Sequence, residues 1–262
     1  MNQTLLVELQ TEELPPKALV KLGAAFASGI ANGLKARDFT DADSVVTAYA
    51  TPRRLAVSIT NVRATSPDKT IREKILPVTV ALDKDGNPTA PLAKKLAALG
   101  FPDLKVSDLE RAQDGKADSF FYTYTAPGSV LAAGLQPVLE ETVAKLPIPK
   151  VMSYQRPDGA TVQFVRPVHS LLALHGENVV PLSLLGLDAG RATLGHRFLS
   201  NGQPFDIVHA DAYNELLKVF GKVVANAEER KESIRTQLLA KAGADQVLMP
   251  ESLLEEVAAL VE

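Results

Sequence analysis

The sequence contains no cysteine and no tryptophan, and these absences remove whole classes of protein from consideration. Without cysteine the chain can form neither a disulfide nor a thiolate metal site, which fits a protein of a reducing compartment. Residues 1–8 lack the basic region, apolar core and cleavage site of a secretory signal. No apolar run approaches the ~20 residues that a membrane-spanning helix needs. We therefore expect a soluble, cytoplasmic protein that does not associate with membranes.

The sequence also lacks the motifs of nucleotide-binding and hydrolytic enzymes. It contains no GxxxxGK[ST] phosphate loop, no dinucleotide fingerprint after its first predicted strand, no HExxH and no GxSxG nucleophile elbow. Its histidines are scattered, so a histidine metal site would require three distant segments to converge. We therefore expect no catalytic residue, no metal site and no cofactor-binding residue in this chain.

What is present is a basic centre in a mildly acidic chain. The formal net charge is −3, yet five basic and three acidic residues give residues 147–198 a net charge of +2. Pro147, Pro149, Pro157 and Pro167 fix φ and remove backbone donors, so we predict short extended pieces joined by tight corners. Cationic corners in an acidic protein are a candidate contact surface for phosphate or for an acidic partner.

The candidate contact residues for RNA or a partner subunit are cationic or imidazole side chains at predicted corners: Arg53, Arg54, Lys150, Arg166, His169, His196 and Arg197. A guanidinium group offers a planar fork that suits phosphate or carboxylate, so the arginines carry more weight than the lysine. The alternative, which stays open for each arginine, is that it bonds backbone carbonyls or a nearby acid and thereby holds a loop. His196 can likewise be a hydrogen-bonded turn residue instead of a base.

Hydrophobic periodicity predicts an α+β fold, with a mixed sheet and flanking helices, that ends in a helical segment. Residues 4–10, 45–50 and 55–62 read as strands, the last two joined by a turn at residues 51–54. A helix should follow the first strand, with Thr11 as a cap and acids in its first turn. Its apolar stripe comprises Leu19, Leu22, Phe26, Ile30 and Leu34.

The later segments are predicted as strands at residues 75–82 and 178–187, a hairpin of residues 106–112 and 119–125, and helices over residues 89–100, 128–146, 213–220, 228–241 and 252–261. Four aromatic residues cluster at positions 120–124, where they either stack on bases or pack in a sheet. We predict an α+β domain over residues 1–210 and an acidic helical segment over residues 211–262 that continues it. The final residues carry no helix stop signal, so we expect an interrupted polypeptide.

Several strings, collinear along the chain, resemble the β subunit of the bacterial heterotetrameric glycyl-tRNA synthetase. They are Leu5-Leu6-Val7-Glu8, Thr11-Glu12-Glu13-Leu14-Pro15-Pro16, Thr51-Pro52-Arg53-Arg54, Leu146-Pro147-Ile148-Pro149-Lys150, Phe164-Val165-Arg166-Pro167-Val168-His169, Gly195-His196-Arg197-Phe198 and Leu253-Leu254-Glu255-Glu256-Val257. The family's β chain is much longer, so this sequence would be its N-terminal part. One departure concerns residues 150–155, where the family usually has KSMRWG and this chain has KVMSYQ.

The resemblance implies a subunit of a class II ligase, an α2β2 heterotetramer that uses ATP and Mg²⁺ to join glycine to tRNA(Gly) with release of AMP and diphosphate. In that family the adenylation site lies on the α subunit, while β binds tRNA and its N-terminal region is similar to a B3/B4 domain. Three hypotheses for this chain follow. It positions tRNA and contacts the α subunit, it serves only assembly, or it retains an editing-like role.

Overall fold

The computed structural model describes residues 2–115, 117–156 and 158–262, and the chain divides into two compact units. Unit 1 comprises residues 1–66 and 129–262, and unit 2 comprises residues 67–128. Both segments of the predicted division, 1–210 and 211–262, thus contribute to unit 1. Unit 2 is inserted within the first of these segments, and the predicted division of the chain does not contain it.

Unit 1 combines one mixed sheet with helices, as the sequence predicts. Its elements, in chain order, are β1 (Asn2–Thr11), α1 (Pro16–Ala36), β2 (Val46–Thr51), β3 (Arg54–Arg63), α4 (Leu131–Ala144), β7 (Met152–Gln155), β8 (Thr161–Phe164), β9 (Val168–His175), β10 (Asn178–Val179), β11 (Ser183–Leu184), β12 (Leu187–Gly190), β13 (Ala192–Thr193), β14 (Phe205–Asp206), η2 (Ala210–Ala212), α5 (Tyr213–Leu216), η3 (Leu217–Gly221), α6 (Ala227–Ala242) and α7 (Glu251–Ala258).

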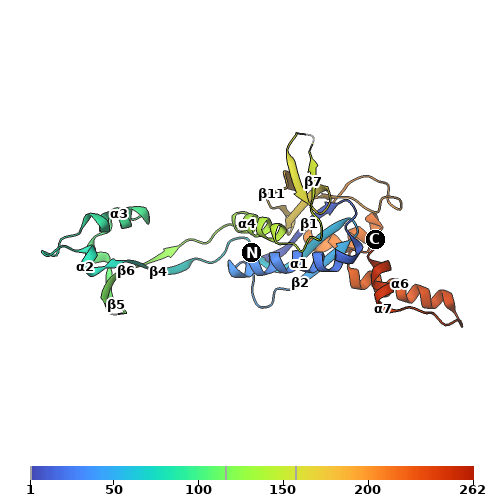
Figure 1. The fold of residues 1–262 in the computed structure, drawn as a ribbon, viewed down its shortest axis with the longest axis horizontal. Coiled ribbons are helices and arrows are strands. Elements are labelled where there is room, and N and C mark those ends of the chain that lie inside the picture. The colour runs from blue at the N-terminus through green and yellow to red at the C-terminus, as the bar shows by residue number, and fades with distance from the viewer. Residues whose placement is uncertain (1, 116, 157) are drawn as a thin grey trace. The chain divides into compact units, whose positions relative to one another are not determined.

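The large sheet of unit 1 has the order β11-β12-β9-β1-β3-β2, with β10 also paired to β9. Strand β12 runs parallel to β9, and the other pairs are antiparallel. Helices α1 and α4 lie side by side on one face, where they cover the alternate residues Leu5, Val7 and Leu9 of β1 (Figure 1). The burial of this apolar layer supplies the main core of the unit.

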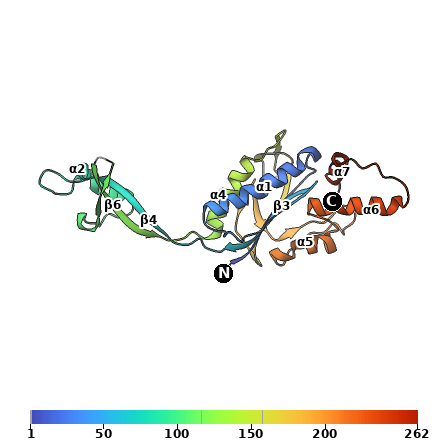
Figure 2. The ribbon, with the colours of Figure 1, turned by 90° about the horizontal axis from the view of Figure 1, so that it is seen from below.

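The opposite face of the sheet is covered by the segment that runs through η2, α5 and η3. Leu6 of β1 and Leu172 of β9 point to this side and pack with Tyr213 and Leu217. In Figure 2 the sheet strand β3 lies between α1 and α5. Both faces are therefore buried, which explains why β1 reads as a nearly continuous apolar run and not as a clean alternation.

Helix α1 carries the predicted apolar stripe, all of it buried, but its start differs from the prediction. The helix begins at Pro16, its N-cap is Pro15, and its first turn contains no acid. Thr11 ends β1, so Glu12 and Glu13 lie in the connecting loop and not in the helix. The prolines decide this boundary, because a residue before proline disfavours the helical region and proline itself suits the first helical position.

Close packing of α1 on α4 depends on two glycines of α1. A Cβ atom at Gly29 would lie 2.6 Å from the Thr142 side chain, and one at Gly33 would lie 2.5 Å from the Val138 side chain. Helix α4 also contains Pro137, as expected, and begins at Leu131, after the predicted start at residue 128. The two helices therefore approach more closely than side chains at these positions would permit.

Unit 2 is a three-stranded antiparallel sheet, β4-β6-β5, with short helices. Its elements are β4 (Lys69–Pro77), α2 (Val78–Ala81), α3 (Ala90–Ala98), η1 (Val106–Asp108), β5 (Glu110–Asp114) and β6 (Ala117–Ala126). The predicted strand over residues 75–82 is wrong in its second half, because the chain turns into α2 after Pro77. Of the clustered aromatics, Phe120 is buried and Tyr122 packs with Phe101 and Tyr124, which favours the packing alternative.

The remaining predictions concern the second half of unit 1. A single strand over residues 178–187 is wrong, because β10, β11 and the start of β12 share this segment. The three helical stretches after residue 211 are confirmed as α5 with η3, α6 and α7. Within the described ranges, no helix is long and apolar enough to cross a membrane.

Candidate functional site

The loop that connects β1 to α1, residues 12–15, forms the centre of the candidate site. Two other segments are hydrogen-bonded to it and to the end of β1. The backbone of Thr11 donates to the Arg53 carbonyl at 2.8 Å, and Glu12 donates to the Pro167 carbonyl at 2.9 Å. Leu14 donates to the Pro52 carbonyl at 2.6 Å. The β2–β3 turn and the residues before β9 are therefore held against one loop, although they are far apart in sequence.

Glu12 collects cationic and imidazole groups from these segments. The Nε2 atom of His169 lies 2.9 Å from one carboxylate oxygen, and Nη2 of Arg197 donates to the other at 3.2 Å. Partial burial opposes ionisation, but the His169 hydrogen bond and the charges of Arg53 and Arg197 outweigh it and lower the pKa of Glu12. Glu12 is therefore a carboxylate at neutral pH, held by groups that also suit phosphate.

Arg166 completes the group that we call the cationic cluster, namely Arg53, Arg166, His169 and Arg197. Its Nε donates to the Glu13 carbonyl at 2.9 Å and its Nη1 donates to the Val165 carbonyl at 3.0 Å. With Arg197 it lines an open groove of about 620 Å³ beside the loop. Arg166 thus satisfies the loop-holding alternative and still faces a surface that a ligand can reach.

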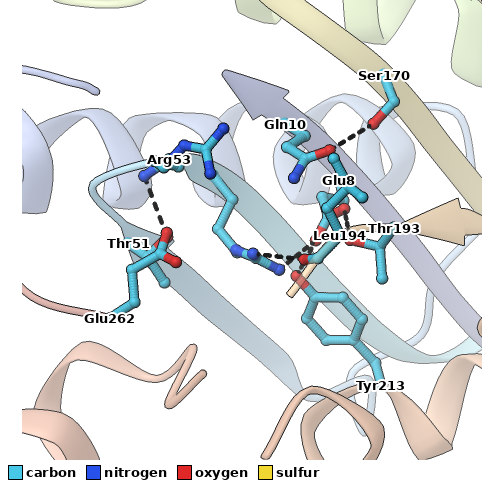
Figure 3. A network of polar contacts seen from close by, with 10 residues as sticks. Glu8, Gln10, Thr51, Arg53, Ser170, Thr193, Leu194, Tyr213 and Glu262 are labelled. Atoms are coloured by element: carbon cyan, nitrogen blue, oxygen red, sulfur yellow. Dashed lines mark hydrogen bonds and ion pairs between the residues drawn. The ribbon is translucent and has the colours of Figure 1, made fainter. Parts of the chain in front are cut away.

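Arg54, by contrast, is completely buried, so it does not belong to this surface. Its Nη1 lies 3.4 Å from Glu8 Oε2, and its Nη2 donates to the Leu194 carbonyl at 2.9 Å. Glu8 also accepts from Thr193 Oγ1 at 2.6 Å and from the Tyr213 hydroxyl, and both side chains point toward it in Figure 3. This buried ion pair links the sheet to the segment that covers it, although the buried Nε of Arg54 has no hydrogen-bond partner among the described residues.

The ionisation of this buried network follows from its contacts. Burial disfavours the Arg54 cation, but the Glu8 carboxylate outweighs this effect, and the pKa of Arg54 is raised. Burial and then the same carboxylate raise the pKa of Tyr213 well above its usual value, so the phenol remains protonated and donates. Arg54 is therefore a cation in this network, and Tyr213 is a neutral donor.

The structure also shows the surroundings of the two remaining candidates, Lys150 and His196. Lys150 is exposed in the segment before β7. His196 is a turn residue, because its Nδ1 accepts hydrogen bonds from the backbone of Phe198 and of Leu199, both at 3.1 Å. The turn alternative therefore holds for His196, while Arg197, its neighbour, extends to Glu12.

Sequence reasoning missed the importance of Glu8, Tyr213 and Arg230. Glu8 had a signal, because it is a lone charge in an apolar strand and a buried charge requires a partner. Arg230 had none: it lies in the charged sequence of α6, yet it is buried and donates to the carbonyls of Ala50, Val224 and Ala258 at 2.7–2.8 Å. Burial lowers the pKa of Arg230 to about 10, which leaves it charged at neutral pH.

Guanidinium and imidazole side chains make up the cationic cluster. In the part of the chain that the structure describes, no group of three histidine, aspartate or glutamate side chains is placed to hold a metal ion. The cationic cluster presents guanidinium donors, which bind phosphate and carboxylate. Donors of this kind can bind phosphate or carboxylate groups of a partner.

Comparisons with known proteins agree with the resemblance seen in the sequence. The family model described as glycyl-tRNA synthetase beta subunit matches residues 5–262. The glycine–tRNA ligase beta subunit of Ralstonia nicotianae is 58% identical over 263 residues, which cover 99% of this chain and 38% of the relative. That of Leptothrix cholodnii is 53% identical over 265 residues, which cover 100% of this chain and 37% of the relative. The chain thus spans well under half the length of these relatives and belongs to the glycyl-tRNA synthetase beta-subunit family.

Proposed function

We propose that this chain serves glycyl-tRNA synthesis as the N-terminal part of a β subunit, in which its cationic cluster contacts the phosphate backbone of tRNA(Gly). The observation that carries the proposal is the convergence of Arg53, Arg166, His169 and Arg197, from three distant segments, on the loop before α1. The names of the relatives support the reaction class. ATP and Mg²⁺ would be used through the α subunit of an α2β2 enzyme.

Phosphate contacts explain why such a surface needs arginines but no sequence-reading groups. Contacts to phosphate add affinity and orientation without distinguishing bases, and they weaken as salt rises because bound counterions are released. Arg54 is excluded from this role, since its guanidinium is buried with Glu8. His196 belongs to the proposal only as the residue before Arg197, and Lys150 is an exposed cation with no contact to the cationic cluster among the described residues.

A second candidate function, support of subunit assembly, is favoured by the contacts of Arg166. Two of its donors are already used by backbone carbonyls of its own unit. If this describes the whole cluster, the arginines maintain a surface that meets the α subunit and not RNA. The editing hypothesis is not carried further, because no contact of a described side chain supports it.

The test uses the α subunit and a full-length β chain that begins with this region. Three substitutions, Arg53→Gln, Arg166→Gln and Arg197→Gln, should together weaken tRNA(Gly) binding to the assembled enzyme by tenfold or more. They should also make the plot of log binding constant against log salt concentration less steep, by the equivalent of up to about three phosphate contacts. Adenylate formation should not change.

The control is Arg111→Gln in unit 2, where Arg111 pairs with Asp118 on an exposed strand. It removes one charge of the same kind without altering the cationic cluster. Unchanged tRNA affinity at two salt concentrations in the triple variant would refute the phosphate contact. Loss of α-subunit association in that variant would favour the assembly function.

A further inference from the structure

An exposed aromatic side chain, that of Phe198, directly follows Arg197 of the cationic cluster in the sequence. Phe198, in the turn after β13, is 83% exposed, and Leu199 beside it is 66% exposed. Phe26, Phe39 and Phe164 are fully buried, whereas Phe220, at the end of the segment that covers the sheet, is 61% exposed and less open than Phe198. Exposure of this extent loses the free energy that burial of a phenylalanine would supply. Phe198 therefore requires an explanation other than packing within its own unit.

The turn that carries Phe198 is tightly built. Gly195 lies against Gly221 so closely that a Cβ atom would fall 2.6 Å from the Gly221 carbonyl oxygen. The His196 backbone donates to that oxygen at 2.7 Å, and the His196 ring accepts from the backbone of Phe198 and Leu199. The Ser200 hydroxyl donates to the His196 carbonyl at 2.8 Å. The ring is thus presented by an ordered turn that would bind a ligand with little loss of conformational entropy.

The neighbouring charges indicate what kind of ligand this ring would meet. Arg197 precedes Phe198, so their Cα atoms are only about 3.8 Å apart, and the Arg197 guanidinium reaches Glu12 next to His169. The guanidinium groups of Arg53, Arg166 and Arg197 lie around the β1–α1 loop, residues 12–15. An apolar ring beside phosphate-binding groups is the arrangement that proteins use for single-stranded nucleic acid, with bases stacked on aromatics and the backbone in a cationic groove.

We propose that Phe198 is a stacking platform for an unpaired RNA base, whose adjoining phosphate is bound by Arg197 and the cationic cluster. This inference rests on the proposed function and makes it narrower, because it assigns the surface to a single-stranded part of the RNA and not to a duplex. In a duplex each base is already stacked between its neighbours, so it cannot lie on the Phe198 ring unless it is first unstacked. A protein partner would also cover Phe198, and the test separates the two.

The test compares two forms of one probe, a single-stranded RNA dodecamer with a central 2-aminopurine and the same strand in a duplex, binding to the α subunit assembled with a full-length β chain that begins with this region. Stacking on Phe198 should quench 2-aminopurine fluorescence in the single strand. Phe198→Leu keeps an apolar side chain but removes the π-face, so the single strand should bind about tenfold more weakly, equivalent to about 1.4 kcal/mol. Phe198→Trp should restore quenching, and duplex binding should stay within about twofold throughout.

Leu199→Ala is the matched control, because it removes an exposed apolar side chain from the same turn without removing a ring. It should leave quenching in place. Failure of the wild-type chain to bind the single strand would overturn the inference, as would equal weakening of both probes by Phe198→Leu. Loss of α-subunit association with unchanged RNA binding would assign Phe198 to a protein partner and also overturn it.

The inference and the proposed function can fail separately. If Arg197→Gln weakens both probes while Phe198→Leu changes neither, the phosphate contact stands and the stacking platform is wrong. If the arginine substitutions change neither probe, the phosphate contact is wrong, and with it the placement of the RNA on which the platform rests.

Discussion

The Glu12 carboxylate accepts a hydrogen bond from the Arg197 guanidinium at 3.2 Å, across 185 positions of sequence. Its other oxygen lies 2.9 Å from Nε2 of His169. A carboxylate thus occupies the place between cationic groups where a phosphate oxygen would bind. Glu12 therefore competes with phosphate for Arg197, and a bound phosphate must displace the Glu12 carboxylate.

The substitution Glu12→Gln should strengthen tRNA binding. It removes the negative charge while it keeps the size of the side chain, so the guanidinium of Arg197 is released for phosphate. Because exposed ion pairs are worth at most about 1 kcal/mol, the expected gain in affinity is about two- to fivefold. Filter binding of tRNA(Gly) at low and at moderate salt measures it, and the gain should shrink at the higher salt.

Glu177→Gln provides the control for that experiment. Glu177 is exposed just beyond the end of β9 opposite to His169, so its removal changes the net charge equally but not the cluster. An equal gain in both variants would attribute the effect to net charge. Weaker binding of the Glu12→Gln variant would mean that Glu12 orders the cluster and does not compete with RNA.

Tyr213→Phe should destabilise unit 1 by about 1–3 kcal/mol, because the buried Glu8 carboxylate then loses one of its donors. Urea unfolding followed by circular dichroism measures this change. Tyr49→Phe is the matched control. The Tyr49 ring packs edge-on against Tyr213, but within the described residues its hydroxyl has no hydrogen-bond partner, so little should change. Equal losses in both variants would assign the effect to ring packing.

The same tyrosine predicts a pH dependence at the alkaline end. The pKa of Tyr213 is raised in the folded state, so above the usual tyrosine value of about 10 the unfolded chain releases a proton that the folded chain keeps. Folding stability should therefore fall as pH rises past this value. The Tyr213→Phe variant should lose less stability than the wild type between pH 8 and pH 10.5, as measured by urea midpoints. Parallel losses would contradict the raised pKa.

Arg230→Met should destabilise unit 1 by at least about 3 kcal/mol. The buried carbonyls of Ala50 and Ala258 and the partly buried carbonyl of Val224 lose a charged donor, and each unpaired group costs about 1 kcal/mol or more. Arg235→Met, on the same helix, removes only exposed ion pairs to Glu232 and Glu251 and should cost less than about 1 kcal/mol. Thermal unfolding of the two variants measures the losses of stability. Equal losses would contradict the claim that the buried hydrogen bonds of Arg230 stabilise unit 1.

Unit 2 should be removable without loss of unit 1. Where the insertion leaves and re-enters, Ser66 donates to the Ser129 carbonyl and Ser129 donates to the Ser66 hydroxyl, both at 2.9 Å. A two-glycine turn in place of residues 67–128 can therefore close the chain across these residues. We expect a cooperative unfolding transition and retained tRNA binding by the cationic cluster. Loss of the cooperative transition would show that the folding of unit 1 depends on unit 2. A folded product that no longer binds tRNA would show that RNA binding requires unit 2.

The sequence alone determined those features that depend on neighbours along the chain. The sequence predicts the apolar stripe of α1, the two strands that correspond to β2 and β3, and the turn at residues 51–54, and the structure contains them. The collinear sequence motifs also indicated the family. The predicted start of α1 was wrong because Thr11 and the acids after it resemble capping residues. In the structure Thr11 pairs with Val168 in the sheet, and the prolines set the start of the helix at Pro16.

Only the tertiary structure determines that Arg54 is buried while Arg53 stays partly exposed. Arg53 and Arg54 are adjacent in one turn and chemically identical, so no local pattern separates them. Adjacent side chains at the start of a strand point to opposite sides. Arg54 meets Glu8 under the cover that Tyr213 supplies from far along the chain, while Arg53 remains partly exposed near Glu12. That cover is a long-range contact, which short-range periodicity does not encode.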